Sequence, residues 1–201
     1  GVVFGIETNI PIKGGNAAQR RENDKQIGGG TMSRSGAKCP CCGAIMTMED
    51  IRLEGKAGRL GAVHTAVVID GQKDKEYRLP TAHEIRMAGA AEKKIAGIFA
   101  DIPFGLPEEG IMEDAKRNTW CVQYGLDRFV KLFTMRQLLA MGTFMKWARA
   151  AGNQLTDRGY QTDWVGGVVT SLAAMLDRLA NQSSSLSRWN QGGEKIEGTF
   201  A

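Results

Sequence analysis

Two stretches in the second half of the chain repeat apolar residues with the period of an α-helix. In residues 135–148 the apolar side chains cover one broad face, and Gly152 is expected to end that helix. In residues 164–179 the apolar positions form a cleaner helical stripe. The pattern predicts two amphipathic helices that pack against each other.

Two capping signatures support these helix boundaries. Thr134 stands three residues before Gln137, and Thr81 stands three residues before Glu84. In a capping box the hydroxyl accepts the amide of the third helical residue, whose own side chain bonds back to the cap. We therefore expect one helix to start after Thr134 and another to run from Thr81 to about residue 95.

The first half of the chain has the shorter, β-branched runs that are typical of strands. Residues 2–6 predict a short strand, and residues 62–70 predict a longer one. Gly71 favours a turn, after which residues 75–79 can form the hairpin partner. A short helix is expected in residues 47–53, and Gly55, Gly58 and Gly61 are expected to stop it.

Polar, glycine-rich stretches separate these segments. Residues 13–38 are aperiodic and can bury little apolar surface, so they predict a mobile loop. Residues 101–118 carry prolines, glycines and many charges, so they predict a linker.

The elements together predict an α+β fold, in which a small zinc-ribbon-like β-hairpin region precedes a helical subdomain. Residues 1–38 would hold a strand and a flexible polar loop, and residues 39–80 a half zinc-ribbon and the hairpin. Residues 81–118 would hold a helix and a linker, and residues 119–201 the helical subdomain.

Composition narrows the class of protein. The formal net charge is +4, so the chain is only mildly basic. No apolar run approaches the length of a membrane span and no signal sequence is present, which predicts a cytoplasmic protein without a membrane partner. Three of the four cysteines crowd into four residues, a pattern unlike a disulfide framework.

The crowded cysteines form the most specific motif of the chain. Cys39 and Cys42 have the spacing of a zinc knuckle, in which both sulfurs point to one side of a tight turn; Pro40 stiffens the turn and Gly43 lets its amides face the sulfurs. A structural zinc needs four ligands, and the other candidates do not form a second knuckle: Cys41, Cys121, His64 and His83. Either the missing pair lies outside this chain, or the turn is a metal-free pair of reduced thiols.

Three basic residues follow the knuckle among flexible glycines: Arg52, Lys56 and Arg59. Long cations on such a segment can reach a phosphate backbone, which predicts a nucleic-acid contact. A solvated surface face is an equally good interpretation, because the proportion of charged residues is ordinary.

Two other motifs are weaker. The glycines at 28–30 follow no apolar strand and open no helix, so they favour a linker over a phosphate loop. Residues 98–104 end in Asp101, Ile102, Pro103 and Phe104, which is similar to the strand and Asp-Pro-Pro-aromatic tetrapeptide of amino-methyltransferases. A proline is missing and no cofactor loop accompanies it, so a linker turn is favoured.

Several segments together resemble the zinc-ribbon-containing adenine-specific DNA methylases of bacteria and archaea. The similar segments follow the family's order along the chain: residues 36–38, 54–62, 77–81, 124–126, 132–144, 177–180 and 184–189. Ser187 departs from the family, which often has cysteine there, and residues 13–35 match poorly.

The resemblance implies an interior segment of a large adenine-N6 methyltransferase that uses S-adenosylmethionine, often in restriction or phage defence. It implies that the other cysteine pair of the ribbon lies before Gly1 and that the catalytic tetrapeptide lies elsewhere in the parent protein. The segment itself would then support the structure or engage DNA, without catalytic residues of its own.

Two alternatives stay open. The chain can be a free-standing zinc-ribbon module that binds nucleic acid or another protein. It can also self-associate through the Met-rich face of the helix in residues 135–148.

Overall fold

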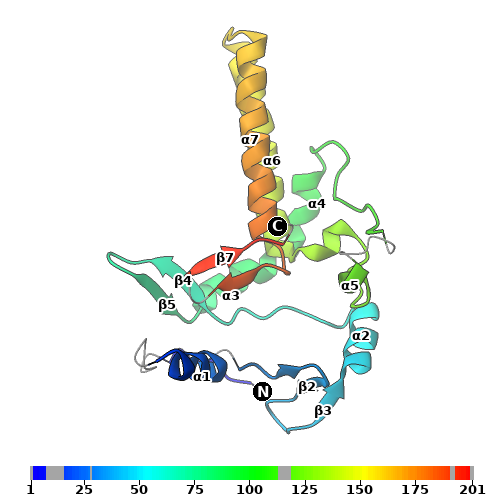
Figure 1. Ribbon diagram of the computed structural model, residues 1–201. Coiled ribbons are helices and arrows are strands. Elements are labelled where there is room, and N and C mark those ends of the chain that lie inside the picture. The colour runs from blue at the N-terminus through cyan, green and yellow to red at the C-terminus, as the bar shows by residue number, and fades with distance from the viewer. Residues whose placement is uncertain (1, 8–15, 28, 113–118, 191–192, 200–201) are drawn as a thin grey trace. The chain divides into compact units, whose positions relative to one another are not determined.

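The computed structural model describes residues 2–7, 16–27, 29–112, 119–190 and 193–199. The chain divides into two compact units (Figure 1), of which unit 1 is Gly1–Pro80 with Gln123–Gly125 and unit 2 is Thr81–Val122 with Leu126–Ala201. Helices and small antiparallel sheets occur together, which confirms the α+β class.

Unit 1 begins with elements that the hydrophobic pattern did not predict. In place of the expected loop, the structure has a helix and two strands: α1 (Ala17–Ile27), β1 (Met32–Ser33) and β2 (Gly36–Lys38). Helix α1 is stabilised at its start by Asn16, whose side-chain oxygen accepts the amides of Ala18 and Gln19. The prediction of a loop was wrong because this helix is held by its cap and not by an apolar face.

The strand expected in residues 2–6 is also absent from the described residues 2–7. Val3 is almost fully exposed there. A β-branched run needs a neighbouring strand to bond its backbone, and none of the strands in the described part of the chain pairs with this segment.

Strand β2 lies at the centre of a three-stranded antiparallel sheet, between β1 and β3 (Ile45–Thr47). Thr47 then forms a capping box with Asp50 and starts α2 (Met48–Lys56). The helix includes Gly55 and ends at Lys56, before Gly58, so the predicted short helix is confirmed and ends within the run of glycines expected to stop it. Further along, β4 (Val67–Asp70) and β5 (Lys75–Arg78) pair antiparallel, which confirms the predicted hairpin, although its first strand starts later than expected.

Unit 2 is mainly helical. Its helices are α3 (Ala82–Ala90), α4 (Glu92–Phe99), α5 (Thr119–Val122), a 3₁₀ turn η1 (Phe129–Leu132), α6 (Met135–Asp157) and α7 (Thr162–Gln182). Both predicted capping boxes are present, at Thr81 and Thr134. The single helix expected from Thr81 is divided at Ala91, and its second part, α4, continues to Phe99. A hairpin of β6 (Arg188–Asn190) and β7 (Lys195–Glu197) follows α7 and was not predicted.

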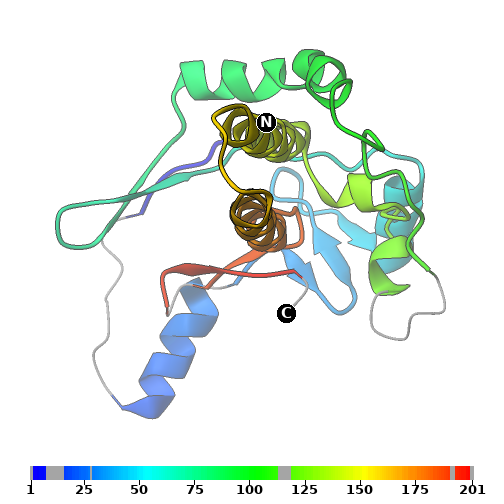
Figure 2. The same ribbon diagram turned by 90° about the horizontal axis from the view of Figure 1, so that it is seen from above.

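The core of unit 2 lies between α4, α6 and α7. The two long helices run side by side, and Figure 2 shows them nearly end-on with α3 and α4 alongside. The buried cluster consists of Ile95, Phe99, Ile102, Leu138 and Met141, and Leu138 is only 1% exposed. The predicted packing of the two amphipathic helices is confirmed. Among the described residues, no helix combines the length and the apolar character that crossing a bilayer requires.

Gly152 has a different role from the predicted one. A Cβ atom added at this glycine would lie 2.8 Å from Cγ2 of Val169, so its absence lets α6 and α7 approach closely. Helix α6 therefore continues to Asp157, and the chain turns at Gly159, which has φ of +80°. The prediction of a helix end was wrong because a glycine at a helix contact and a glycine at a helix end look alike in sequence.

Candidate metal turn and nucleic-acid surface

The cysteine turn joins β2 to β3 within unit 1. The backbone amide of Cys39 donates to the carbonyl of Ala44 at 2.8 Å, and the amide of Gly43 donates back to the carbonyl of Cys39 at 2.9 Å. Gly43 has φ of +77°, a conformation that glycine adopts without strain. The sequence therefore folds into the tight turn that the Cys-x-x-Cys-Gly pattern predicted.

Backbone amides of this turn are directed at the first sulfur. The backbone amides of Cys42 and Cys41 lower the pKa of the Cys39 thiol by hydrogen bonding to its charged form, and the amide of Cys42 has the larger effect. Hydrogen bonds to the charged form favour the thiolate, which is the form that binds metal ions. The turn is chemically suited to present a metal-binding sulfur at Cys39, with Cys42 exposed beside it.

The donor set is nevertheless partial in the part of the chain that is described. No group of three or more His, Cys, Asp and Glu side chains is placed there to share a metal ion. Cys121 is buried in unit 2. Cys39 and Cys42 thus fit half of the tetrahedral set that a structural zinc requires.

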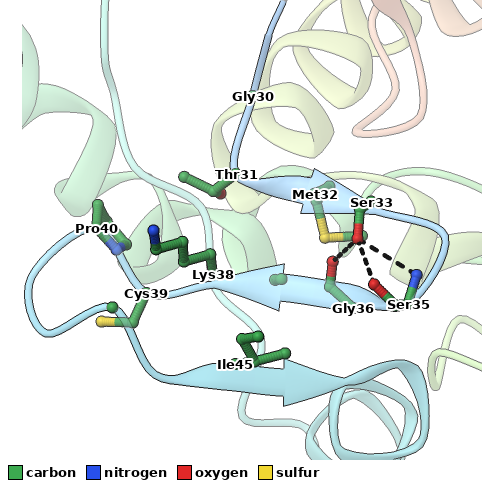
Figure 3. A pocket seen from close by; sticks show the side chains of 12 residues that line it. Gly30, Thr31, Met32, Ser33, Ser35, Gly36, Lys38, Cys39, Pro40 and Ile45 are labelled. Atoms are coloured by element: carbon green, nitrogen blue, oxygen red, sulfur yellow. Dashed lines mark hydrogen bonds between the residues drawn. The ribbon is translucent and has the colours of Figure 1, made fainter.

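A shallow hollow of about 530 Å³ lies along the three-stranded sheet. Figure 3 shows the side chain of Cys39 at one end and the hydroxyl of Ser33 at the other, where it bonds to Ser35 and to the carbonyl of Gly36. Gly36 is required at this place, because an added Cβ would lie 2.0 Å from the carbonyl oxygen of Met46. The Ser33 bonds hold the turn between β1 and β2, and the close approach of Gly36 to Met46 lies in the β2–β3 hairpin that carries the cysteine turn.

The three predicted basic residues differ in their surroundings. Arg52, on α2, lies with its guanidinium carbon 5.9 Å from the ring centre of Tyr124 and pairs with Glu49 at 3.5 Å. Arg59 forms a two-pronged bond with Glu54, at 2.6 and 2.7 Å, which raises the pKa of Arg59 and lowers that of Glu54.

Lys56 is the most available of the three cations. It is the last residue of α2, is exposed, and forms no ion pair with any described residue. A lysine without a carboxylate partner can contact a phosphate without first breaking a bond within the protein. Lys56 is therefore the strongest single candidate for a nucleic-acid contact on this segment.

Tyr124 was not predicted as part of this surface. It reaches Arg52 because two glycines allow the backbones to touch: a Cβ on Gly125 would lie 2.1 Å from the carbonyl oxygen of Gly55, and Gly125 has φ of +82°. The contact joins residues about 70 positions apart in sequence, so no local pattern could reveal it. The glycine at position 125 is the sequence feature that could have suggested this contact.

The tetrapeptide at 101–104 lies on the helical unit and lacks the context of a catalytic motif. The residues before it belong to helix α4 and not to a strand, and Ile102 is buried in the core. Asp101 pairs with Lys146 at 2.9 Å. Phe104 is fully exposed with φ of +68°. This geometry agrees with the favoured prediction of a turn.

Comparison with known proteins adds no relative: no protein-family model, no curated protein and no solved structure matches this chain. The resemblance to adenine-specific DNA methylases therefore stays a prediction from the motifs.

Proposed function

We propose that this chain is an interior segment of an S-adenosylmethionine-dependent adenine-N6 DNA methyltransferase, in which it supports the structure or engages the target DNA. Zinc would be held in part by Cys39 and Cys42, and the remaining donors would come from outside the described residues. S-adenosylmethionine would supply the methyl group in the parent protein, and no residue of this chain is assigned to it.

The observation that carries the proposal is the tight turn closed by the backbone bonds from Cys39 to Ala44 and from Gly43 to Cys39, in which the amides of Cys42 and Cys41 lower the pKa of Cys39. A turn that stabilises a thiolate and places a second cysteine beside it suits a zinc ligand better than an inert thiol. The burial pattern of unit 1 supports this interpretation. All buried apolar side chains of the described residues belong to unit 2: Ala91, Ile95, Phe99, Ile102, Cys121, Leu132, Leu138, Met141 and Val165.

A unit without its own apolar core needs another source of stability, and a structural metal is a common one. In such a unit the metal holds strands together while the surface stays free for binding. The ordered α2 surface with Lys56 at its end is the part of unit 1 best suited to contact a phosphate backbone.

Zinc uptake tests the metal part of the proposal. Calorimetry on the purified chain should show weak binding that is lost in Cys39→Ser and in Cys42→Ser. Cys41→Ser, on the same turn, is the matched control and should retain uptake. X-ray absorption that finds four protein donors from this chain would contradict the half-site, and zinc uptake unaffected by Cys39→Ser would remove the proposed ligand.

DNA affinity tests the engagement part. Fluorescence anisotropy with duplex DNA at several salt concentrations should show a salt slope that falls by about one in Lys56→Gln, as expected for one lost phosphate contact. Lys73→Gln makes the same charge change on an exposed residue of the β4–β5 turn and should leave the slope unchanged. Equal effects of the two variants would assign the affinity to net charge and not to this surface.

A further inference from the structure

The outer face of helix α7 in unit 2 carries apolar side chains that no described residue of that unit covers. Trp164 is 52% exposed and Met175 is 66% exposed. Between them runs a shallow groove lined by Asp163, Trp164, Gly167, Val168, Ser171 and Leu172. This face lies beside the one that packs on α6, so helix α7 has a second apolar stripe with no function inside the unit.

Two details show that the stripe is ordered and accessible. The rings of Tyr160 and Trp164 stack with their centres 5.0 Å apart and their planes 20° apart, which holds the tryptophan in place although both residues are exposed. At Gly167 an added Cβ would meet nothing within 4 Å. Glycine is unfavourable inside a helix, and here no neighbour requires it, so the site leaves room for an approaching backbone.

Charges at the two ends of the stripe are complementary. Asp163 begins a row of residues at spacings of three and four that passes through Gly167 and Ser171 and ends at Arg178, so these positions share one helix face. Asp163 and Arg178 are both exposed, and neither forms an ion pair with any residue that the structure describes. At a rise of about 1.5 Å per residue they are ~22 Å apart along the helix.

We propose that this face binds the same face of a second copy of the chain, with the two α7 helices antiparallel. A two-fold axis between Thr170 and Ser171 places Asp163 of each copy level with Arg178 of the other, so both charge pairs form at once. The same axis places Trp164 within two residues of Met175 across the contact. One self-complementary arrangement therefore uses both the apolar stripe and both unpaired charges.

This interface differs from the self-association predicted from the Met-rich face in residues 135–148. On that face Leu138 and Met141 are buried in the core of unit 2, where they pack beside α4 and α7. The stripe of α7 is available without any rearrangement of the core.

Charge reversal tests the proposal most sharply. Sedimentation of the purified 201-residue chain should show a dimer, and Asp163→Arg or Arg178→Asp alone should each weaken it about tenfold, because each places like charges together at two symmetric points. The double variant should restore the dimer. An equimolar mixture of the two single variants should also form a mixed dimer, because each variant then meets its complement.

The mixture separates the interface from helix stability, since Asp163 also lies in the first turn of α7. Oxidative cross-linking gives an independent check. Ser171→Cys should cross-link across the two-fold axis, whereas Ala173→Cys, exposed on the opposite side of the same helix, should cross-link no more than the parent chain. A monomer throughout the micromolar range, a dimer insensitive to both reversals, or preferential cross-linking through Ala173→Cys would overturn the proposal.

Discussion

The two units reach order by different means. Unit 2 has the apolar cluster around Leu138, which long amphipathic helices bring together from distant parts of the chain. In unit 1 the described residues hold short strands, capped helices and close glycine contacts, and their buried residues are Gly36 and Gly55. The comparison shows that an apolar core explains one unit, whereas the other depends on backbone geometry and, in our proposal, on a metal.

The largest expected effect tests the core of unit 2. Leu138→Ala should lower the free energy of unfolding by about 2–5 kcal/mol, because it leaves a cavity where nothing can collapse easily. All four tryptophans belong to unit 2, so tryptophan fluorescence during urea unfolding reports this change directly. The control is Ile45→Ala in unit 1, where the side chain is exposed; a comparable loss there would contradict the difference between the units.

The glycine contact tests the order of unit 1. Gly125→Ala should destabilise the unit by about 1–3 kcal/mol from backbone strain, with a further loss from the overlap with the carbonyl of Gly55. Gly58→Ala is the matched control, because Gly58 also has a positive φ, of +70°, but an added Cβ meets nothing within 4 Å. Hydrogen exchange of α2 should rise much more in the first variant, and equal effects would show that the contact with Gly55 is unimportant.

A helix cap gives a smaller effect. Thr134→Ala removes the hydroxyl that accepts the amide of Gln137 and should cost about 1 kcal/mol of unit 2 stability. Thr134→Ser keeps the hydroxyl and should restore most of it. Urea unfolding followed by tryptophan fluorescence measures both variants. An unchanged unfolding midpoint in Thr134→Ala would mean that the cap does not contribute to the stability of unit 2.

The smallest expected effect is a pH dependence at the cysteine turn. Because the pKa of Cys39 is lower in the folded state than in the unfolded state, the thiolate contributes stability that is complete above the unfolded pKa and is lost as the pH falls through the folded pKa. Alkylation of Cys39 followed by mass spectrometry should therefore titrate at a lower pH in the folded chain than in guanidinium. Identical titration curves would show that the amides do not stabilise the thiolate.

The sequence was informative where structure depends on local pattern. The helical stripe of α7, the capping boxes at Thr81 and Thr134, the β4–β5 hairpin and the turn at Cys39 could all be predicted, because each depends on residues close together in the chain. The cap at Asn16 is also a local feature, but helix α1 was not predicted because its sequence lacks an apolar face.

The remaining features depend on contacts between distant residues. Gly152 looked like a helix end, and only the folded chain shows that it faces Val169; the contact of Gly55 with Tyr124 is likewise visible only in the folded chain. The contact of Arg52 with Tyr124 likewise joins distant residues, whereas Arg59 pairs with Glu54 only five positions away; together the two contacts change which cation is available for DNA. A count of basic residues in the sequence could not distinguish Lys56 from Arg52 and Arg59.

Hydrogen exchange with and without zinc tests the central difference between the units most directly. The account predicts that the core helices α6 and α7 are protected in both conditions, and that zinc increases protection of the β2–β3 hairpin in the natural chain but not in Cys39→Ser. Equal protection of both units without zinc, or the same response to zinc in Cys39→Ser, would contradict it.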